Sequence, residues 1–293
     1  MFYPSQTMKN LKKTSIRVTD IAMQYWCEKQ MELNYIYGPS FKLKETVNAG
    51  KEMHEKLEKE ISVPIILQPK NYADYLFKDF YKSYTAMKSL DKNKKAREIS
   101  LYGIVDNLKL IGKIDELAMN KESIILIENK TRDTNKIPSE AQTLTNKVQI
   151  MVYKKLLNDI IQNKFNYEKF NMIYSLDRMH LTIEFVRQLN ALEIDKDLQN
   201  LNVIAKKFFE IIAKINNLSN NLYLKYINYN TGEELKVLKF EYDENYANEI
   251  LAFSMNYWKG KRNAIPVSEN EQWKCSFCKF FGDKCKVWYN GVK

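Results

Sequence analysis

Residues 112–132 read GKIDELAMNKESIILIENKTR and combine a strongly apolar run with closely spaced charges. The run at residues 124–127 is typical of a buried strand, yet it continues directly into Glu128, Asn129 and Lys130. Burying a carboxylate and an ammonium group is costly unless each has a partner or a metal ion. We therefore expect a strand whose charged end serves a specific purpose.

The sequence on both sides of this stretch predicts a sheet with helices around it. Residues 98–117 are expected to form two strands joined near Asp106 and Asn107, and residues 123–130 a third strand. Ser139 and Gln142 have the spacing of a capping box and begin a long helical pattern over 138–161. The remaining expectations are helices at 18–35, capped by Thr19 or Asp20, and at 49–62, a largely helical 183–217, and a hairpin at 222–243 that turns at 230–232.

Composition describes a folded chain that favours anionic partners. The 293 residues are 45% hydrophobic and carry a formal charge of +10, which suits nucleic acid, although the Lys-rich and Asn-rich composition of an AT-biased genome gives the same sign. No apolar stretch approaches the length of a membrane span, and the N-terminus lacks a secretory signal. We therefore expect an intracellular protein without membrane contact. In that compartment its four cysteines favour metal binding over disulfides.

The charged end of the third strand has the residues of a metal site. Alternation along a strand places Glu128 and Lys130 on one side, and antiparallel pairing with the preceding strand brings Asp115 beside Glu128. Two carboxylates and the carbonyl of residue 129 suit Mg²⁺ or Mn²⁺. Lys130 would orient or deprotonate an attacking water and offset charge on a phosphate, while Gly112 would let a bulky group approach the backbone. The alternative is an ordinary surface salt bridge between Glu128 and Lys130.

Three further side chains accompany this pattern. Gln149 and Tyr153 lie four residues apart on the long helix, so they share one of its faces. His54 lies upstream, on the helix expected at 49–62, where a histidine is more often a solvated residue than a ligand. In chain order these residues form the pattern G-x-x-x-H, G-x-I-D, E-x-K, Q-x-x-x-Y.

The cysteines form a compact trio and one remote member. Cys275, Cys278 and Cys285 are closely spaced, whereas Cys27 lies near the N-terminus. Four thiolates suit a structural zinc ion or a 4Fe-4S cluster. Zinc sites are more often built from two local pairs, so the one-plus-three arrangement favours iron and sulfur.

The ordered motifs resemble the RecB-type branch of the PD-(D/E)XK nucleases, and within it the exonuclease V family. The segments VTDIAMQYWCE at 18–28, REISLYGIVDNLKLIGKIDEL at 97–117 and YWKGKRNAIPVSENEQWKCSFCKFFGDKC at 257–285 are all similar to that family. The resemblance implies an α/β fold with a restriction-endonuclease-like core, helical additions, and a 4Fe-4S cluster that ties the N-terminal and C-terminal segments. It also implies one domain over 1–293, with a basic N-terminus at 1–17, catalytic strands and helix at 97–163, and a cysteine segment at 257–293.

The resemblance further implies roles for the residues that match the motifs. Asp115, Glu128 and His54 would bind the metal, Lys130 would be the catalytic lysine, and Gln149 and Tyr153 would contact the active site or the strand. Cys27, Cys275, Cys278 and Cys285 would hold the cluster.

The implied activity is metal-dependent exonuclease cleavage of single-stranded DNA into short oligonucleotides, in DNA repair or genome maintenance. The family implies a preference for the 5′ end, although the residues themselves do not reveal direction. A monomer is expected, with a single-strand-binding protein as a further partner, in the nucleus or mitochondrion of a eukaryote or the cytoplasm of a prokaryote. The alternatives are a DNA-trimming nuclease of CRISPR adaptation and a nucleic-acid-binding module that has lost its activity.

Two basic runs are candidate contacts to the DNA backbone, and Tyr257 and Trp258 beside the second run are candidates for base stacking. A charge run is more often a solvated face than a binding site. The candidate phosphate contacts are Lys92, Lys94, Lys95, Arg97, Lys259, Lys261 and Arg262.

Overall fold

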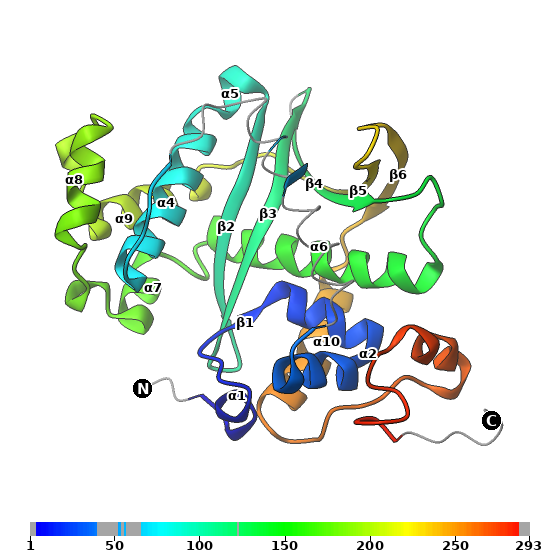
Figure 1. Cartoon of the computed structure of the whole chain (residues 1–293). Helices are drawn as coiled ribbons and strands as arrows, with labels where there is room; N and C mark the ends of the chain where they lie inside the picture. Colours follow the sequence, from blue (N-terminus) through cyan, green and yellow to red (C-terminus); the bar gives the residue numbers. More distant parts are fainter. Residues whose placement is uncertain (1–3, 40–51, 54–55, 57–65, 122, 287–293) are drawn as a thin grey trace.

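The computed structural model describes residues 4–39, 52–53, 56, 66–121 and 123–286. It contains a six-stranded mixed sheet surrounded by helices, which confirms the α/β class. Figure 1 shows a long central hairpin, with the helices of residues 72–93 and 167–213 on one side and the helices of residues 18–37 and 244–258 and the C-terminal segment on the other. Within the described residues, no helix is both long and apolar enough to cross a membrane.

The strands pair in the order β1-β3-β4-β5-β6, and β2 pairs with β3. β2 and β3, β3 and β4, and β5 and β6 are antiparallel, whereas β1–β3 and β4–β5 are parallel. The chain between β4 and β5 contains α6 to α9, as a parallel crossover requires. Their bounds are β1 Ile16–Arg17, β2 Lys95–Val105, β3 Leu108–Asn120, β4 Ser123–Arg132, β5 Leu218–Asn228 and β6 Glu234–Glu241.

The helices lie mostly where the hydrophobic pattern predicts them. The region 183–217 contains α8 and α9, and only residues 52, 53 and 56 of the helix expected at 49–62 are described. The α-helices are α1 Gln6–Asn10, α2 Val18–Tyr37, α4 Tyr72–Lys88, α5 Leu90–Asn93, α6 Glu140–Ile161, α7 Tyr167–Tyr174, α8 Ile183–Ala191, α9 Leu201–Ala213 and α10 Glu244–Trp258. Short 3₁₀ helices are η1 Leu176–Arg178, η2 Lys196–Leu198 and η3 Glu269–Phe277.

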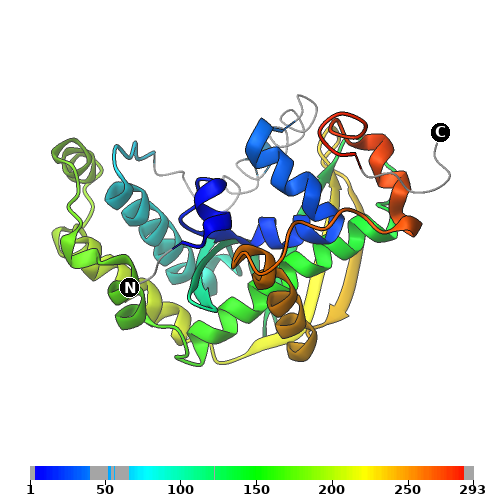
Figure 2. The same ribbon diagram turned by 90° about the horizontal axis from the view of Figure 1, so that it is seen from below.

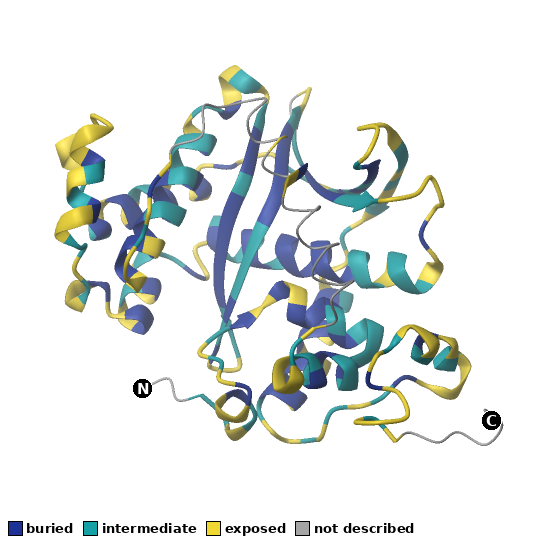
Figure 3. Ribbon diagram, in the orientation of Figure 1, coloured by how far each residue is buried: buried dark blue, intermediate teal, exposed yellow. Residues whose placement is uncertain are grey.

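The β2–β3 hairpin turns at Asp106 and Asn107, as the sequence predicts. Both residues have positive φ, 50° and 62°, which is the geometry of a type I′ turn and which Asp and Asn tolerate. The two strands are buried over most of their length (Figure 3), so they form the centre of the hydrophobic core. The later hairpin of β5 and β6 is also confirmed, with Gly232 at φ 74° in its turn.

The second edge of β3 is only partly paired. β2 occupies one edge of β3 along almost its whole length. On the other edge, β1 pairs with Leu110 and Ile111, and β4 pairs from Glu116 onward. Residues 112–115 therefore face an opening between β1 and β4, and Asp115 lies at this opening.

The first residues of α2 and α6 show how each helix is capped. Ser139 and Gln142 form the expected capping box at the start of α6. The expectation that Thr19 or Asp20 caps α2 is wrong, because the helix begins at Val18 with Arg17 as its N-cap. Asp20 instead accepts the Arg17 backbone N–H at 2.9 Å, a bond typical of an acidic residue in the first turn.

Candidate active site and cysteine cavity

Asp115 and Glu128 approach each other from neighbouring strands, as antiparallel pairing predicts. Glu116 of β3 pairs with Ile127 of β4, so Asp115 and Glu128 follow on opposite strands at the point where pairing ends. Asp115 Oδ2 accepts the Asn129 backbone N–H at 2.8 Å. The two carboxyl residues are 9% and 1% exposed, so the structure does not place them in bulk water.

Lys130, Gln149 and Tyr153 complete a polar network around Glu128. Lys130 Nζ donates to Glu128 Oε1 at 2.8 Å and to Gln149 Oε1 at 2.7 Å. Gln149 Nε2 lies 2.7 Å from Glu128 Oε1 and 2.9 Å from the Tyr153 hydroxyl. The pair therefore joins a buried Glu128 to a partly buried Lys130 whose side chain is 24% exposed, which differs from the surface salt bridge of the alternative interpretation.

The electrostatics of the network favour the charged lysine and the neutral tyrosine. Burial opposes the charge on Lys130, but Glu128 and Asp115 outweigh it and raise the pKa of the lysine above its ordinary value. Burial, together with the same two carboxylates, raises the pKa of Tyr153 well above its usual range. In this arrangement Lys130 carries a positive charge suited to stabilising a phosphate.

Gly112 provides the close approach that the sequence predicts. A Cβ at this position would lie 2.6 Å from Cε1 of Tyr153 and 3.0 Å from Cγ2 of Val18. The absence of a side chain therefore lets α6 bring Tyr153 against β3.

The carboxylates fit a hard divalent cation. Glu128 Oε2 is buried and has no hydrogen-bond partner among the described residues, which is an unfavourable state unless something else contacts that atom. Among the described residues, no three His, Cys, Asp or Glu side chains form a group that could hold a metal ion. His54, the third expected ligand, lies outside the described residues.

The four cysteines line one small cavity. Cys27 comes from α2 and the other three from the C-terminal segment, and together they border a space of about 20 Å³. Figure 2 shows α2 and the C-terminal segment lying side by side. Burial raises the pKa of Cys27 to about 11, with a further contribution from Cys278 and Cys285. Burial first, and then Cys278 and Cys285, also raise the pKa of Cys275. Thiolate sulfur suits zinc or an iron–sulfur cluster, although the sulfur atoms of the described cysteines do not form a metal-binding group in this conformation.

Cys27 interrupts α2, and this interruption places its thiol. Its φ and ψ of −167° and 107° are not helical, and its Sγ accepts the Gln30 backbone N–H at 3.4 Å, as an N-cap would. Because the helix is broken here, the Lys29 N–H bonds to the carbonyl oxygen of Ile265 at 3.0 Å. The C-terminal segment thus joins α2 directly beside Cys27.

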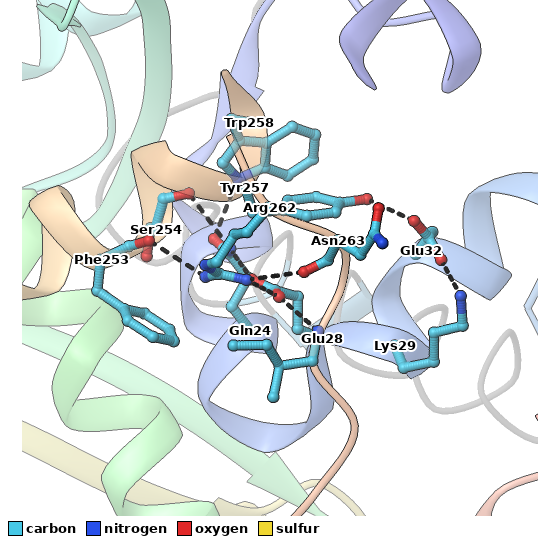
Figure 4. Close-up of polar contacts among 11 residues, drawn as sticks. Gln24, Glu28, Lys29, Glu32, Phe253, Ser254, Tyr257, Trp258, Arg262 and Asn263 are labelled. Atoms are coloured by element: carbon cyan, nitrogen blue, oxygen red, sulfur yellow. Dashed lines mark hydrogen bonds and ion pairs between the residues drawn. The ribbon is translucent and has the colours of Figure 1, made fainter. Parts of the chain in front are cut away.

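A buried ion pair strengthens this junction (Figure 4). Glu28, which is 2% exposed, accepts hydrogen bonds from both terminal nitrogens of Arg262, and the Nη2 distance to Oε1 is 3.0 Å. The Ile265 backbone N–H donates to the same carboxylate at 2.8 Å, and Gln24 Nε2 also contacts it. Residues 24–28 and 262–265 therefore form what we call the Glu28 clamp.

The structure separates the candidate DNA contacts into two groups. Arg97 is buried and pairs with Glu116 at 2.6 Å, and Arg262 belongs to the Glu28 clamp, so neither is placed to meet a phosphate. Lys95 also approaches Glu116, at 3.6 Å, and Lys259 pairs with Asp106 at 3.1 Å. The exposed members are Lys92, Lys94 and Lys261.

The proposed stacking residues are corrected by the structure. Tyr257 and Trp258 are 1% and 0% exposed, because they close α10 against α2. Trp258 Nε1 donates to Gln24 Oε1 at 3.0 Å. These rings stabilise the junction and offer no face to a base.

Sequence reasoning missed Glu28 and the residues around the opening in the sheet. Glu28 had one available signal, an acidic residue next to a cysteine on an apolar helix face. The opening is lined by Arg17, Ser100, Tyr102 and Lys113, among others, and no motif connects these positions.

Comparison with known proteins identifies the family of this chain. The model of the family described as "Exonuclease V - a 5' deoxyribonuclease" matches residues 4–123, 118–207 and 187–289. A curated exonuclease V from Danio rerio is 27% identical over 286 residues, covering 92% of this chain and 70% of that protein. The solved structure of SSO0001 is 14% identical, with a TM-score of 0.43 and coverage of 94% of this chain and 91% of that one, which does not establish a shared fold. The match along nearly the whole sequence shows that the chain belongs to the exonuclease V family.

Proposed function

We propose that this chain is a metal-dependent exonuclease that degrades single-stranded DNA from the 5′ end into short oligonucleotides, in DNA repair or genome maintenance. The observation that carries the proposal is the network of Glu128, Lys130, Gln149 and Tyr153 beside Asp115. Within the described part of the chain, Glu128 Oε2 is buried there without a hydrogen-bond partner. Family membership supports the DNA substrate and the direction, since the matching family is described as a 5′ deoxyribonuclease.

Each residue of the network has a chemical role in this proposal. Asp115 and Glu128, together with His54, would hold Mg²⁺ or Mn²⁺, which would act as a Lewis acid on the phosphodiester and lower the pKa of a bound water. Lys130 offsets the negative charge that develops on the phosphate. Gln149 orients the Lys130 ammonium group and the Tyr153 hydroxyl through its amide. The core that carries these groups would be of the PD-(D/E)XK type.

The cysteines have a structural role in the proposal. Cys27, Cys275, Cys278 and Cys285 would hold a 4Fe-4S cluster that joins the two ends of the sequence. The further elements of the proposal are a monomeric state, a single-strand-binding protein as a partner, and phosphate contacts by the exposed Lys92, Lys94 and Lys261.

The test compares cleavage of 5′-labelled and 3′-labelled single strands, and of duplex DNA, with Mg²⁺ or with EDTA. Asp115→Asn removes an anionic ligand and Lys130→Ala removes the cation, so each is expected to lower cleavage by at least roughly 10²-fold. Strand binding is expected to persist in both variants, since it arises mainly from phosphate contacts. Lys206→Ala, an exposed change on α9, is the control and should cleave as the parent does.

Near-parent cleavage by Asp115→Asn or Lys130→Ala in Mg²⁺, with contaminating nuclease excluded, would refute the assignment of this site. Unchanged cleavage in EDTA would refute the metal dependence.

A further inference from the structure

A cavity of about 440 Å³ lies at the opening in the edge of β3. Its walls come from the start of α2, from β2 and β3, from Asp79 of α4 and from Tyr153 of α6. Tyr153 belongs both to this cavity and to the network around Glu128. The cavity therefore borders the proposed active site directly, and Gly112 of the G-x-I-D pattern also lines it.

Two buried hydroxyl groups belong to the β2 wall. Ser100 and Tyr102 are 2% and 4% exposed, and among the described residues neither hydroxyl has a hydrogen-bond partner outside this pair. Two buried hydroxyls that can bond only to each other leave part of their hydrogen-bonding capacity unused, which is uncommon in folded proteins. The Tyr102 ring is fixed by packing on Phe80 and Phe170, so the position of its hydroxyl is set by the core.

The α2 side of the cavity is positive. Arg17 is exposed and forms no ion pair with another described residue. Thr19 and the first backbone N–H groups of α2, which is regular from Val18 to the break at Cys27, lie next to it, where the helix dipole favours an anion. Lys113 contributes a second cation, held only loosely by Asp79 and Glu98 at 3.8 Å each.

We propose that this cavity is the binding subsite for one nucleotide of the DNA strand, next to the scissile phosphate. The nucleotide's phosphate binds at Arg17 and the start of α2, and its sugar or base forms hydrogen bonds with the Ser100 and Tyr102 hydroxyls. This inference rests on the proposed function for the identity of the polymer, but the subsite itself is defined by the cavity and its polar groups.

A nucleotide fits these features better than a lone anion does. The volume lies within the range of roughly 300–1,000 Å³ typical of small-molecule sites, which exceeds the need of a phosphate ion. The hydroxyls belong to β2, beside Lys113 of the paired strand β3, whereas Arg17 lies at the start of α2. A ligand that reaches both Arg17 and the hydroxyls must carry an anionic and a neutral polar part. A nucleotide has both parts in one molecule.

The experiment measures binding of thymidine 5′-monophosphate to the full chain by calorimetry in EDTA, where no cleavage occurs. Thymidine and inorganic phosphate are tested separately, and both are expected to bind more weakly than the nucleotide. Ser100→Ala/Tyr102→Phe removes the two hydroxyls and keeps the aromatic packing, and it should weaken nucleotide binding at least about tenfold. Arg17→Ala should weaken it similarly, and Ser100→Ala alone provides a milder variant.

A matched control removes two comparable hydroxyls that do not line the cavity. Ser254 and Tyr174 are buried, and their hydroxyls have no hydrogen-bond partner in the described part of the chain; the Tyr174 ring packs on that of Tyr102. Ser254→Ala/Tyr174→Phe should bind the nucleotide as the parent does. Asp115→Asn should also retain binding, because Asp115 does not line the cavity.

The outcomes separate the subsite from the activity. Nucleotide binding that depends on Ser100 and Tyr102 supports the subsite even if the parent cleaves no DNA, a result that would refute only the proposed function. Cleavage that depends on Asp115, combined with equal nucleotide binding by the parent and the Ser100→Ala/Tyr102→Phe variant, would refute the subsite. Equal binding of nucleotide and inorganic phosphate would also refute it.

Discussion

At the scale of single residues, this molecule buries several charged side chains, which is unfavourable for a charged group without a partner. Glu128 and Lys130 stabilise each other at the proposed active site, whereas Lys154 is 1% exposed and pairs with no carboxylate of the described residues. Lys154 Nζ donates to the Ser219 carbonyl oxygen at 2.8 Å, and burial lowers its pKa from 10.5 to about 8. The effect of a substitution on stability or cleavage can therefore be predicted for each of these positions.

Lys154→Met is expected to stabilise the protein at pH 7 and to lose that advantage in alkali. The parent's unfolded state binds a proton more tightly than its folded state, so parent stability rises as pH increases from about 8 to 10.5. At pH 7 the penalty is at most about 3 kcal/mol, and the lost bond to Ser219 offsets roughly 1 kcal/mol of the gain. Urea unfolding of both proteins at pH 7 and pH 10 measures the difference. A difference that does not change with pH would contradict a buried, charged Lys154.

Gly112→Ala is expected to lower cleavage by at least roughly tenfold, because the new Cβ displaces Tyr153 from the network. Overpacking should also destabilise the fold by about 1–3 kcal/mol. Gly103→Ala is the matched control, since its Cβ would lie 2.5 Å from Cδ2 of Leu156 without touching Tyr153. Cleavage rates and melting temperatures of both variants distinguish displacement of Tyr153 from general destabilisation. Equal losses of activity would show that general destabilisation is responsible.

At the scale of elements, the important junction is the one between α2, α10 and the segment that follows α10. The break in α2 at Cys27 frees the Lys29 N–H for Ile265, and the Glu28 clamp fills the space beside it. The basic sequence at 259–262 is thus partly explained by structure, because its arginine is the partner of a buried carboxylate.

Arg262→Met is expected to destabilise the metal-free chain by about 3–5 kcal/mol, because it leaves the Glu28 carboxylate buried without its cation. The loss falls toward the lower end of this range, since the Arg262 side chain is 21% exposed. Lys261→Met, an exposed neighbouring change, should unfold at the same denaturant concentration as the parent. Coincident unfolding of all three proteins would show that the clamp contributes nothing to stability.

At the scale of the whole molecule, the cysteine cavity joins the beginning and the end of the sequence. Cys27 and the trio ending at Cys285 enclose almost the entire sheet between them, so a ligated cluster would close a very long loop. Small metal sites can contribute on the order of 10 kcal/mol to folding. The proposed cluster would therefore act mainly on stability.

The protein purified without air is expected to be brown, with roughly four irons per chain and absorbance near about 400 nm. Cys285→Ala should lose the colour, melt early and give a low soluble yield, whereas Ser276→Ala, an exposed change between Cys275 and Cys278, should do neither. Iron analysis and thermal melting provide the measurements. One zinc and no iron in the parent would refute the cluster, and parent-like melting of Cys285→Ala would refute its role in stability.

The sequence by itself determined the elements and the motif residues. Alternating and helical hydrophobic patterns, a capping box at Ser139 and the Asp106–Asn107 turn are local signals, so the strands, α6 and the approach of Asp115 to Glu128 could be predicted. Gly112 was predictable for the same reason, since a glycine within a strand indicates a close contact.

The tertiary structure alone decided how distant residues meet. Arg97, Arg262, Tyr257 and Trp258 are buried or paired by residues that lie elsewhere in the sequence. The sequence next to a charged or aromatic residue does not indicate whether its side chain will be buried. The opening along β3 arises because β1 and β4 pair with separate parts of one edge, which no single segment encodes. Local sequence sets propensity over a few residues, whereas burial and pairing are set by the whole chain, and that is why the cavity beside Tyr153 emerges only from the fold.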